Sequence, residues 1–280
     1  MRLLLTRRPA QAGDLEAGLR TATGPDGVPF EVGFLPATDT ELPDDDGLAR
    51  LRGAVAALGA GEFAVLVVTS PNTARALAAA GWSGSVPAGV RVAATGPGTV
   101  RVLRQVGLRT DVWVPEEDRS AAGILAGLPG PTRAGERLLL PQSARASDEF
   151  AAGLTGRGWD VRRVEAYRTV AYPGDAARRL LPADPPGADV VSPAALAAAL
   201  RERGPAGDAA PVLVLTSPSA VEELLETPLG PALRQGAVPC VALGAPTRRA
   251  MEGAGVPVAA QALTPDAAGV ADAVARAVRG

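Results

Sequence analysis

The sequence contains no histidine and no lysine, and it has a single cysteine, Cys240. Without histidine the chain cannot form a Ser-His-Asp or Cys-His nucleophile system, and most types of zinc site are excluded as well. One cysteine cannot form an internal disulfide, and its strand-like surroundings predict a buried structural thiol. All 28 basic residues are therefore arginine. With only one isoleucine and one asparagine, this indicates the codon bias of a GC-rich genome, so arginine at any one position is weak evidence of function.

Long apolar runs and basic blocks are also missing. The net charge is −2, so the sequence lacks the electrostatic pattern of a nucleic-acid-binding protein. No stretch reaches the roughly 18 apolar residues that a membrane-spanning helix needs. Arg2 is followed by only three apolar residues, which favours a first strand over a signal peptide and predicts a cytoplasmic protein. The acidic run Asp44-Asp45-Asp46 precedes a helix-like segment, where it predicts capping and dipole compensation rather than a metal site.

The composition is that of a globular protein rather than a disordered one. It has 280 residues, of which 47% are hydrophobic and 21% charged. This length predicts two domains of ordinary size, each able to bury its own core. No cofactor motif is present, so we expect no cofactor and no metal.

A cassette of two signatures occurs twice. The first signature lies at residues 69–74 (Thr-Ser-Pro-Asn-Thr-Ala) and again at 216–221 (Thr-Ser-Pro-Ser-Ala-Val). The second follows at nearly the same distance in both copies, at 94–101 (Ala-Thr-Gly-Pro-Gly-Thr-Val-Arg) and 242–249 (Ala-Leu-Gly-Ala-Pro-Thr-Arg-Arg). Each lies between a strand-like and a helix-like run. A helix that starts at a strand end directs free backbone N–H groups and its positive dipole end beyond the sheet. The repeat therefore predicts two similar α/β lobes, each with an anion-binding rim, which together would form a cleft.

The opening of the chain recurs too. Residues 2–7 (Arg-Leu-Leu-Leu-Thr-Arg) resemble 137–142 (Arg-Leu-Leu-Leu-Pro-Gln). Apolar patterning predicts strands over residues 3–5, 28–35, 63–68, 90–94, 112–114, 137–142, 160–170, 212–215 and 238–241. Helices are expected over residues 10–20, 100–106, 145–154 and 193–203, with others starting at residues 44–48, at Ser120 and near Thr264. Alternating strands and helices imply doubly wound parallel sheets. From the repeat alone, the chain would be divided once, near residue 130.

The ordered motifs resemble the uroporphyrinogen-III synthase family. They run from Leu-Leu-Thr-Arg at residues 4–7 through both cassettes, with Glu-Ala-Tyr-Arg-Thr-Val at 165–170 between them. No single motif is specific, but six in order at the family spacing are. The resemblance covers essentially the whole chain and implies interleaved domains. Domain one would hold residues 1–35 and 173–280, and domain two residues 38–165. A two-stranded connector would run through 36–37 and 166–172.

The resemblance also implies a reaction. The substrate would be hydroxymethylbilane, a linear tetrapyrrole with eight carboxylates, which closes to uroporphyrinogen III with inversion of ring D and loss of water. The open bilane closes unaided to the uninverted isomer, so the enzyme's task is mainly positioning, with electrostatic support for a cationic azafulvene. By this resemblance the product would serve heme, siroheme or cobalamin synthesis. The resemblance further implies a monomer that receives its substrate from hydroxymethylbilane synthase.

By the same resemblance, Tyr167 would be the general acid that assists hydroxide departure, with a half-buried structural tyrosine as the alternative. The expected substrate-binding residues lie at the helix starts and strand ends, where hydroxyls, amides or guanidinium groups could bind carboxylates. They are Arg7, Ser70, Gly96, Thr99, Arg101, Ser217, Ser219, Gly244, Thr247 and Arg248. For the serines and threonines the alternative is helix capping alone, and for the arginines a solvated surface position.

Two other functions remain open from the sequence. One is an anion-binding or sensor protein that kept the fold and lost catalysis, against which the retained Tyr167, Thr99 and Thr247 argue. The other is a two-lobed nucleotide-sugar transferase, which the sequence disfavours because it has neither an Asp-x-Asp pair near a strand end nor a Gly-x-Gly-x-x-Gly run.

Overall fold

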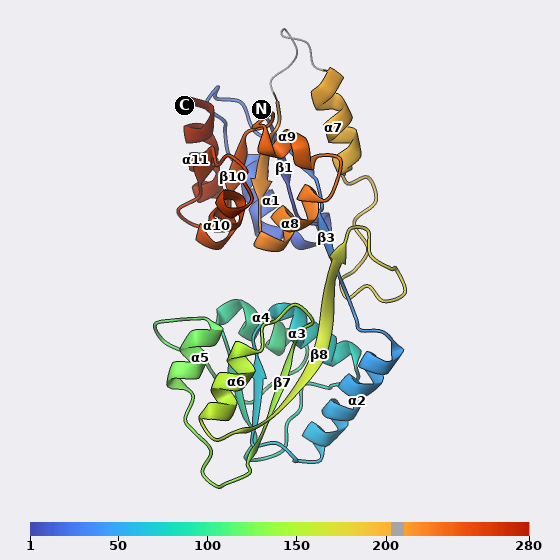
Figure 1. Ribbon diagram of the computed structural model, residues 1–280, viewed down its shortest axis with the longest axis vertical. Coiled ribbons are helices and arrows are strands. Elements are labelled where there is room, and N and C mark those ends of the chain that lie inside the picture. Colours follow the sequence, from blue (N-terminus) through green and yellow to red (C-terminus); the bar gives the residue numbers. More distant parts are fainter. Residues whose placement is uncertain (203–209, 280) are drawn as a thin grey trace. The chain divides into compact units, whose positions relative to one another are not determined.

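The computed structural model describes residues 1–202 and 210–279, and the chain divides into two compact units (Figure 1). Unit 1 comprises residues 1–39, 170–174 and 181–280, and unit 2 comprises residues 40–169 and 175–180. Each unit has a sheet whose central strands are apolar on both faces, such as β4 (Val65–Val68) and β9 (Val212–Leu215). Fully buried strands of this kind are typical of parallel sheets with helices on both sides.

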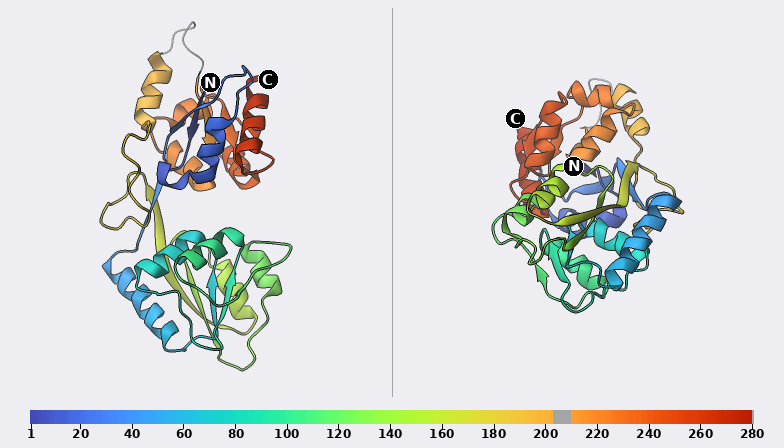
Figure 2. Two further views of the ribbon diagram at one scale, coloured as in Figure 1. Left: turned by 180° about the vertical axis from the view of Figure 1, so that it is seen from behind. Right: turned by 60° about the horizontal axis from the view of Figure 1, so that its bottom comes forward.

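Unit 1 contains a five-stranded sheet in the order β11-β10-β9-β1-β2, with parallel pairing throughout. Besides β9, its strands are β1 (Arg2–Leu5), β2 (Glu31–Phe34), β10 (Cys240–Ala242) and β11 (Ala260–Gln261). Helices α1 (Gly13–Thr21) and α11 (Ala267–Arg279) pack on one face. The other face is covered by α7 (Pro193–Glu202), α8 (Pro218–Leu225), α9 (Gly230–Arg234) and α10 (Ala245–Gly253) (Figure 2). A 3-10 turn, η1 (Pro9–Gln11), precedes α1.

Unit 2 contains a six-stranded sheet in the order β3-β8-β7-β4-β5-β6. Besides β4, its strands are β3 (Thr38–Glu41), β5 (Arg91–Ala94), β6 (Val112–Trp113), β7 (Arg137–Ser143) and β8 (Asp160–Ala171). One face packs against α2 (Asp45–Gly59), α3 (Pro71–Ala79) and α4 (Pro97–Gln105), and the other against α5 (Ala121–Gly127) and α6 (Glu149–Gly156). Strand β3 lies where the chain passes from unit 1 into unit 2.

The mixed α/β fold with parallel sheets agrees with the prediction, whereas the single division near residue 130 is wrong. Strands on either side of that point pair in one sheet, with Val65 beside Leu138 and Leu66 beside Leu139. Unit 2 also includes residues 175–180. The reason is that the backbone N–H of Leu180 donates to the Thr40 carbonyl at 2.9 Å, which adds this short segment to the start of unit 2.

Several element boundaries differ from the predicted ones. The helix expected over 145–154 begins only at Glu149, because the Ser143 hydroxyl accepts the Arg145 amide proton at 3.2 Å and holds the chain in a turn. The helix expected over 100–106 begins at Pro97, since proline suits the first helical position. Strand β2 is shorter than the expected 28–35. Arg203, the expected last residue of α7, lies outside the described residues.

Two local predictions are confirmed. Asp44 is the N-cap of α2, and its carboxylate accepts the Gly47 amide proton at 2.9 Å. This bond and the neighbouring Arg168 guanidinium lower the pKa of Asp44. Cys240 is a buried free thiol in β10, and desolvation raises its pKa to about 12. None of the helices in the described part of the chain combines the length and apolar character needed to cross a membrane.

Candidate active site

The carboxyl end of the unit 2 sheet has a topological switch point between β4 and β7. After β4 the chain enters α3 on one face of the sheet, whereas after β7 it enters α6 on the other face. In open α/β sheets, ligands bind in the crevice beyond the strand ends at such a point. Ser70 follows β4, Gln142 and Ser143 end β7, and Tyr167 lies near the end of the adjacent β8. Topology therefore brings these polar residues to one edge.

Ser70 and Tyr167, two predicted site residues, are in contact. Their hydroxyl oxygens are 3.1 Å apart, although the two residues are far apart in the sequence. Ser70 is the N-cap of α3, and its Oγ accepts the Thr73 amide proton at 3.1 Å. The predicted capping role of Ser70 is thus confirmed. In addition, its hydroxyl holds the half-buried Tyr167 phenol beside the positive end of a helix.

A bulge in β8 turns Tyr167 toward Ser70. Gln142 pairs with Glu165, but the next residue, Ser143, pairs with Tyr167, so Ala166 is an extra residue in β8. Ala166 and Tyr167 both pack against the apolar cluster that includes α3. If β8 continued regularly, Ala166 would pair with Ser143, and Tyr167, one position further on, would face the opposite side of the sheet, toward α5 and α6. Bulges near functional sites commonly re-aim a side chain in this way.

The second signature of unit 2 forms the start of α4. Gly96 is the N-cap, with an extended backbone and no side chain to cap the helix. Thr99 lies in the first turn and is buried, so the N-cap interpretation of this threonine is wrong. Its hydroxyl lies 3.4 Å from that of Thr95, which in turn donates to the Thr69 carbonyl at 3.0 Å. These bonds tie the ends of β4 and β5 together. Pro97 has no N–H and the Thr99 amide donates to the Gly96 carbonyl at 3.1 Å, so the Gly98 amide is the candidate donor at the start of α4.

Unit 1 has the same arrangement at its own switch point, between β1 and β9. Helix α1 follows β1 on one face, and α8 follows β9 on the other. The strand ends are joined by Thr6, whose Oγ1 accepts the Thr216 amide proton at 3.0 Å. Ser217 is the N-cap of α8 and accepts the Ala220 amide proton at 3.2 Å. Ser219 lies within the first turn rather than at the cap, and its hydroxyl is 3.1 Å from that of Ser217.

The second signature of unit 1 repeats the geometry of α4. Gly244 is the extended N-cap of α10. Thr247 is buried in the first turn, so the N-cap interpretation is wrong for this threonine as well. Gly244 follows β10, the strand beside β9, and the two helix starts lie at neighbouring strand ends.

The three predicted arginines differ in their surroundings. Arg7 follows β1 and is half-buried. Burial lowers the pKa of its guanidinium, and within the described part of the chain no hydrogen bond or ion pair neutralises it. Arg101 is exposed on α4. Arg248 is also exposed and forms an ion pair with Glu252 of its own helix at 2.7 Å. Arg7 is therefore the best placed of the three to bind a carboxylate.

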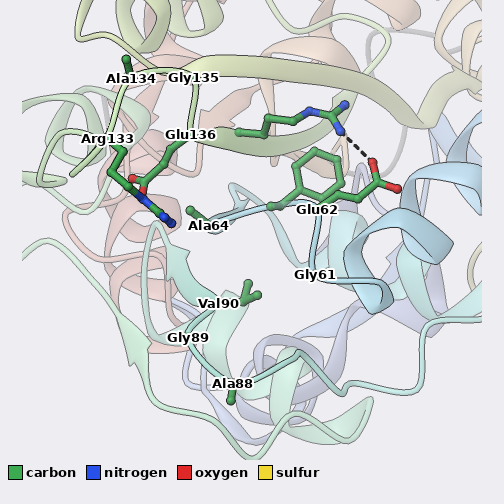
Figure 3. A pocket seen from close by; sticks show the side chains of 12 residues that line it. Gly61, Glu62, Ala64, Ala88, Gly89, Val90, Arg133, Ala134, Gly135 and Glu136 are labelled. Atoms are coloured by element: carbon green, nitrogen blue, oxygen red, sulfur yellow. Dashed lines mark hydrogen bonds and ion pairs between the residues drawn. The ribbon is translucent and has the colours of Figure 1, made fainter.

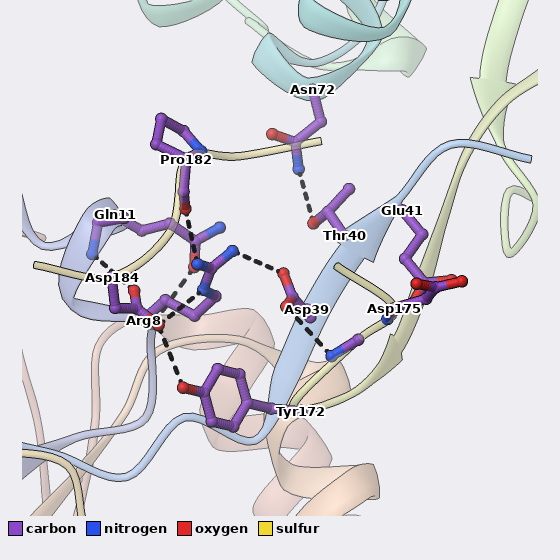
Figure 4. Close-up of polar contacts among 12 residues, drawn as sticks. Arg8, Gln11, Asp39, Thr40, Glu41, Asn72, Tyr172, Asp175, Pro182 and Asp184 are labelled. Atoms are coloured by element: carbon purple, nitrogen blue, oxygen red, sulfur yellow. Dashed lines mark hydrogen bonds and ion pairs between the residues drawn. The ribbon is translucent and has the colours of Figure 1, made fainter. Parts of the chain in front are cut away.

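Arg8, next to Arg7, is the centre of a buried polar cluster that the sequence did not predict (Figure 4). Its guanidinium donates to Asp39 at 2.8 Å, to Asp184 at 3.2 Å and to the Pro182 carbonyl at 2.7 Å. The Asp184 carboxylate also accepts from the Tyr172 hydroxyl at 3.1 Å. The side chains of Arg8 and Asp39 are both 0% exposed. This cluster fixes the chain directly after Arg7.

Two further polar residues near the unit 2 edge were missed. Arg75 of α3 is half-buried, donates to the Asn72 side-chain oxygen at 3.0 Å, and has its pKa lowered by burial. Gln142 is buried at the end of β7. The sequence did contain a signal for the second: aligning the two openings of the repeat places Gln142 opposite Arg7.

A cavity of about 540 Å³ lies at the opposite, amino-terminal edge of the unit 2 sheet (Figure 3). Its charged lining is largely self-neutralised, because Arg137 pairs with Glu62 at 2.7 Å and Arg133 with Glu136 at 3.5 Å. It contains none of the predicted site residues. The carboxyl edge, where the helix starts and the Ser70 and Tyr167 hydroxyls meet, is the better candidate for the active site.

The two capping serines allow a matched stability test. Ser70→Ala and Ser217→Ala each remove an N-cap acceptor, so each should lower the free energy of unfolding by about 1 kcal/mol. Ser70→Ala also removes the hydroxyl that contacts Tyr167, and it should lose about another 1 kcal/mol. Denaturant unfolding of the two variants and the wild type measures these differences in the free energy of unfolding. A Ser217→Ala variant less stable than Ser70→Ala would contradict the Ser70–Tyr167 contact.

Comparisons with known proteins point to one family. The family model described as "Uroporphyrinogen-III synthase HemD" matches residues 28–272. The chain is 34% identical over 163 residues to the chloroplastic uroporphyrinogen-III synthase of Oryza sativa subsp. japonica, a match covering 56% of this chain and 52% of the rice protein. This chain thus spans about half the length of that relative.

Solved structures show the same fold. A mutant uroporphyrinogen III synthase from the extremely thermophilic bacterium Thermus thermophilus superposes with a TM-score of 0.61 at 20% identity, covering 100% of this chain and 99% of the other. The uroporphyrinogen-III synthetase of Helicobacter pylori gives 0.52 at 13% identity, with 97% of both chains covered. With most of its length matched by the family model, the chain belongs to the uroporphyrinogen-III synthase family.

Proposed function

We propose that this protein converts hydroxymethylbilane to uroporphyrinogen III, with inversion of ring D and loss of water. Family membership supports this activity. The observation that carries the proposal within the chain is the Tyr167 phenol, which the β8 bulge places against Ser70 at the switch-point edge. A phenol at such an edge can donate a proton without any histidine, which fits a chain that has none.

In the proposed mechanism Tyr167 is the general acid. Its hydroxyl donates a proton to the departing hydroxide of the bilane, which leaves as water and generates an azafulvene cation. The substituted carbon of ring D then attacks, and the resulting spiro intermediate rearranges to the inverted macrocycle. Loss of one ring proton gives the neutral product and restores the Tyr167 phenol. Because the uncatalysed closure gives the uninverted isomer, the protein contributes chiefly by holding the bilane in the productive conformation.

Carboxylate binding is proposed for the helix starts. Ser70, with the Asn72 and Gly98 amides at the starts of α3 and α4, offers donors in unit 2. Ser217, Ser219 and the Ala245 amide offer donors in unit 1. Arg7 adds an unneutralised positive charge. Thr99 and Thr247 would act mainly by shaping these turns, since both are buried. Arg248 would have to exchange its Glu252 partner for substrate.

Several broader assignments are part of the same proposal. The two units would be the two interleaved domains of the family, with the connector at residues 36–37 and 166–172. The protein would act as a monomer in the cytoplasm, receive its substrate from hydroxymethylbilane synthase and need no cofactor.

A turnover assay tests the proposal. Purified protein incubated with enzymatically generated hydroxymethylbilane should give predominantly the type III isomer, and the result should be the same with a chelator present. Chromatography of the oxidised products separates types I and III. Only type I isomer, at the spontaneous rate, would favour the alternative of a binding protein without catalysis. Activity lost with chelator and restored by a metal would contradict cofactor independence.

A further inference from the structure

Gln142 has a buried side-chain oxygen with no hydrogen-bond donor. The residue is 5% exposed, and its Oε1 has no partner within the described part of the chain. Leaving a buried acceptor unpaired is unfavourable, and most buried polar atoms in native proteins have a partner. Such an atom in the middle of a core would be a defect. Gln142 instead ends β7, at the switch point where a ligand is expected.

The position of Gln142 is defined by its neighbours in the sheet. On one side it pairs with Glu165 of β8, two residues before Tyr167. On the other side lies β4, which leads into Ser70. Gln142 shares its sheet face with Leu138 and Leu140, which pack toward α5 and α6, while Ser70 and Tyr167 lie toward α3. Gln142 therefore lies on one face of the sheet and Ser70 and Tyr167 on the other, all at the carboxyl edge.

The internal repeat makes Gln142 the counterpart of Arg7. Both residues stand at the sixth position of the repeated opening, and both closely follow the buried Leu-Leu-Leu run of a strand at its unit's switch point. The chemistry of the two differs. Arg7 presents a guanidinium, which can only donate hydrogen bonds, whereas Gln142 has an unpaired carbonyl oxygen, which can only accept one. Equivalent positions in the two units therefore present opposite hydrogen-bonding groups.

A tetrapyrrole carries both kinds of group. Its carboxylates need donors, which the helix-start amides of unit 2 can supply. Its pyrrole N–H groups need acceptors, which amide protons cannot provide, and the Ser70 Oγ already accepts the Thr73 amide proton. On the basis of the proposed function, we propose that Gln142 Oε1 accepts a hydrogen bond from a pyrrole N–H of the substrate and product, and so helps to fix the orientation of one ring.

The test compares Gln142→Met with Arg7→Met. Both variants keep an unbranched side chain and remove the polar group. In Gln142→Met the affinity for uroporphyrinogen III, measured under anaerobic conditions, should fall about fivefold, as expected for one neutral hydrogen bond. This loss of affinity in Gln142→Met should be the same at low and high salt. In Arg7→Met the loss should shrink as salt rises, because it comes from charge. The share of type I product should rise in Gln142→Met.

Unfolding without ligand separates a binding role from a structural one. Since Gln142→Met removes an unpaired buried acceptor, the melting temperature of the free protein should stay the same or rise, while the shift caused by uroporphyrinogen III should shrink. A variant that melts lower than wild type yet keeps wild-type affinity and isomer ratio would overturn the proposal. So would unchanged affinity with unchanged stability. If wild type makes no type III isomer, the proposed function fails; if wild type does and Gln142→Met matches it, only this inference fails.

Discussion

Replacing Tyr167 by phenylalanine should lower kcat for hydroxymethylbilane about 10²-fold, the lower end of the effect of a positioned general acid. The substitution removes one oxygen and leaves the ring that packs beside α3. Ser70 loses the Tyr167 hydroxyl, 3.1 Å away, but still caps its helix through the Thr73 amide. The free energy of unfolding should therefore fall by only about 1 kcal/mol. Steady-state kinetics with isomer analysis measures the catalytic effect.

Substrate affinity and isomer ratio should respond differently in this variant. In the proposed site carboxylate binding is spread over many donors, so affinity for uroporphyrinogen III should change less than about tenfold, or about 1.4 kcal/mol. Bilane that is not turned over closes spontaneously, so the share of type I isomer should increase.

The chain has one other tyrosine, which serves as a control. The Tyr172 hydroxyl donates to Asp184 in the Arg8 cluster and is not part of the candidate site. Tyr172→Phe should keep near-normal turnover and isomer ratio while removing a comparable hydrogen bond. Near-normal turnover in Tyr167→Phe would make Tyr167 a structural residue, and the helix-start amides would then have to account for the chemistry.

The strands and helix starts were predictable from sequence because their signals are local. Four-residue apolar runs such as those of β4 and β9 identify buried parallel strands. Serine before proline identifies the helix starts at Ser70 and Ser217. Short elements such as β3 and α9 were missed, since two to five residues carry little periodicity. The single division near residue 130 failed because sequence similarity between two halves does not show which strands pair.

The candidate site was predictable only where residue type and position along the chain sufficed. The helix-start serines fall in that class, whereas Tyr167 was expected only from the resemblance to the family. The contact between Ser70 and Tyr167 depends on a bulge at Ala166, and nothing in the surrounding sequence marks that extra residue. Thr99 and Thr247 lie inside the first turn because a glycine three residues earlier is the N-cap of each helix. Polar partners across long separations, such as Arg8 with Asp184, depend on tertiary structure alone.

Asp39→Ala should destabilise the protein by about 3–5 kcal/mol, because it leaves the fully buried Arg8 guanidinium without its buried partner. Asp184, which is 15% exposed, remains but cannot occupy the same place. Denaturant unfolding at neutral pH measures the loss. Domains are stable by only about 5–15 kcal/mol, so this loss would be a substantial fraction of the free energy of unfolding.

The comparison with a double variant shows whether the effect comes from an uncompensated charge. Replacing both partners, Arg8→Met with Asp39→Leu, removes the buried charge together with its counter-ion, so the loss should be clearly smaller than in Asp39→Ala alone. The exposed pair of Arg2 with Asp189, at 2.8 Å, is the control: Asp189→Ala should cost less than about 1 kcal/mol, because solvent screens that pair. A double variant as unstable as the sum of its single variants would show that Arg8 and Asp39 contribute independently, and that the cluster owes its stability to packing rather than to charge compensation.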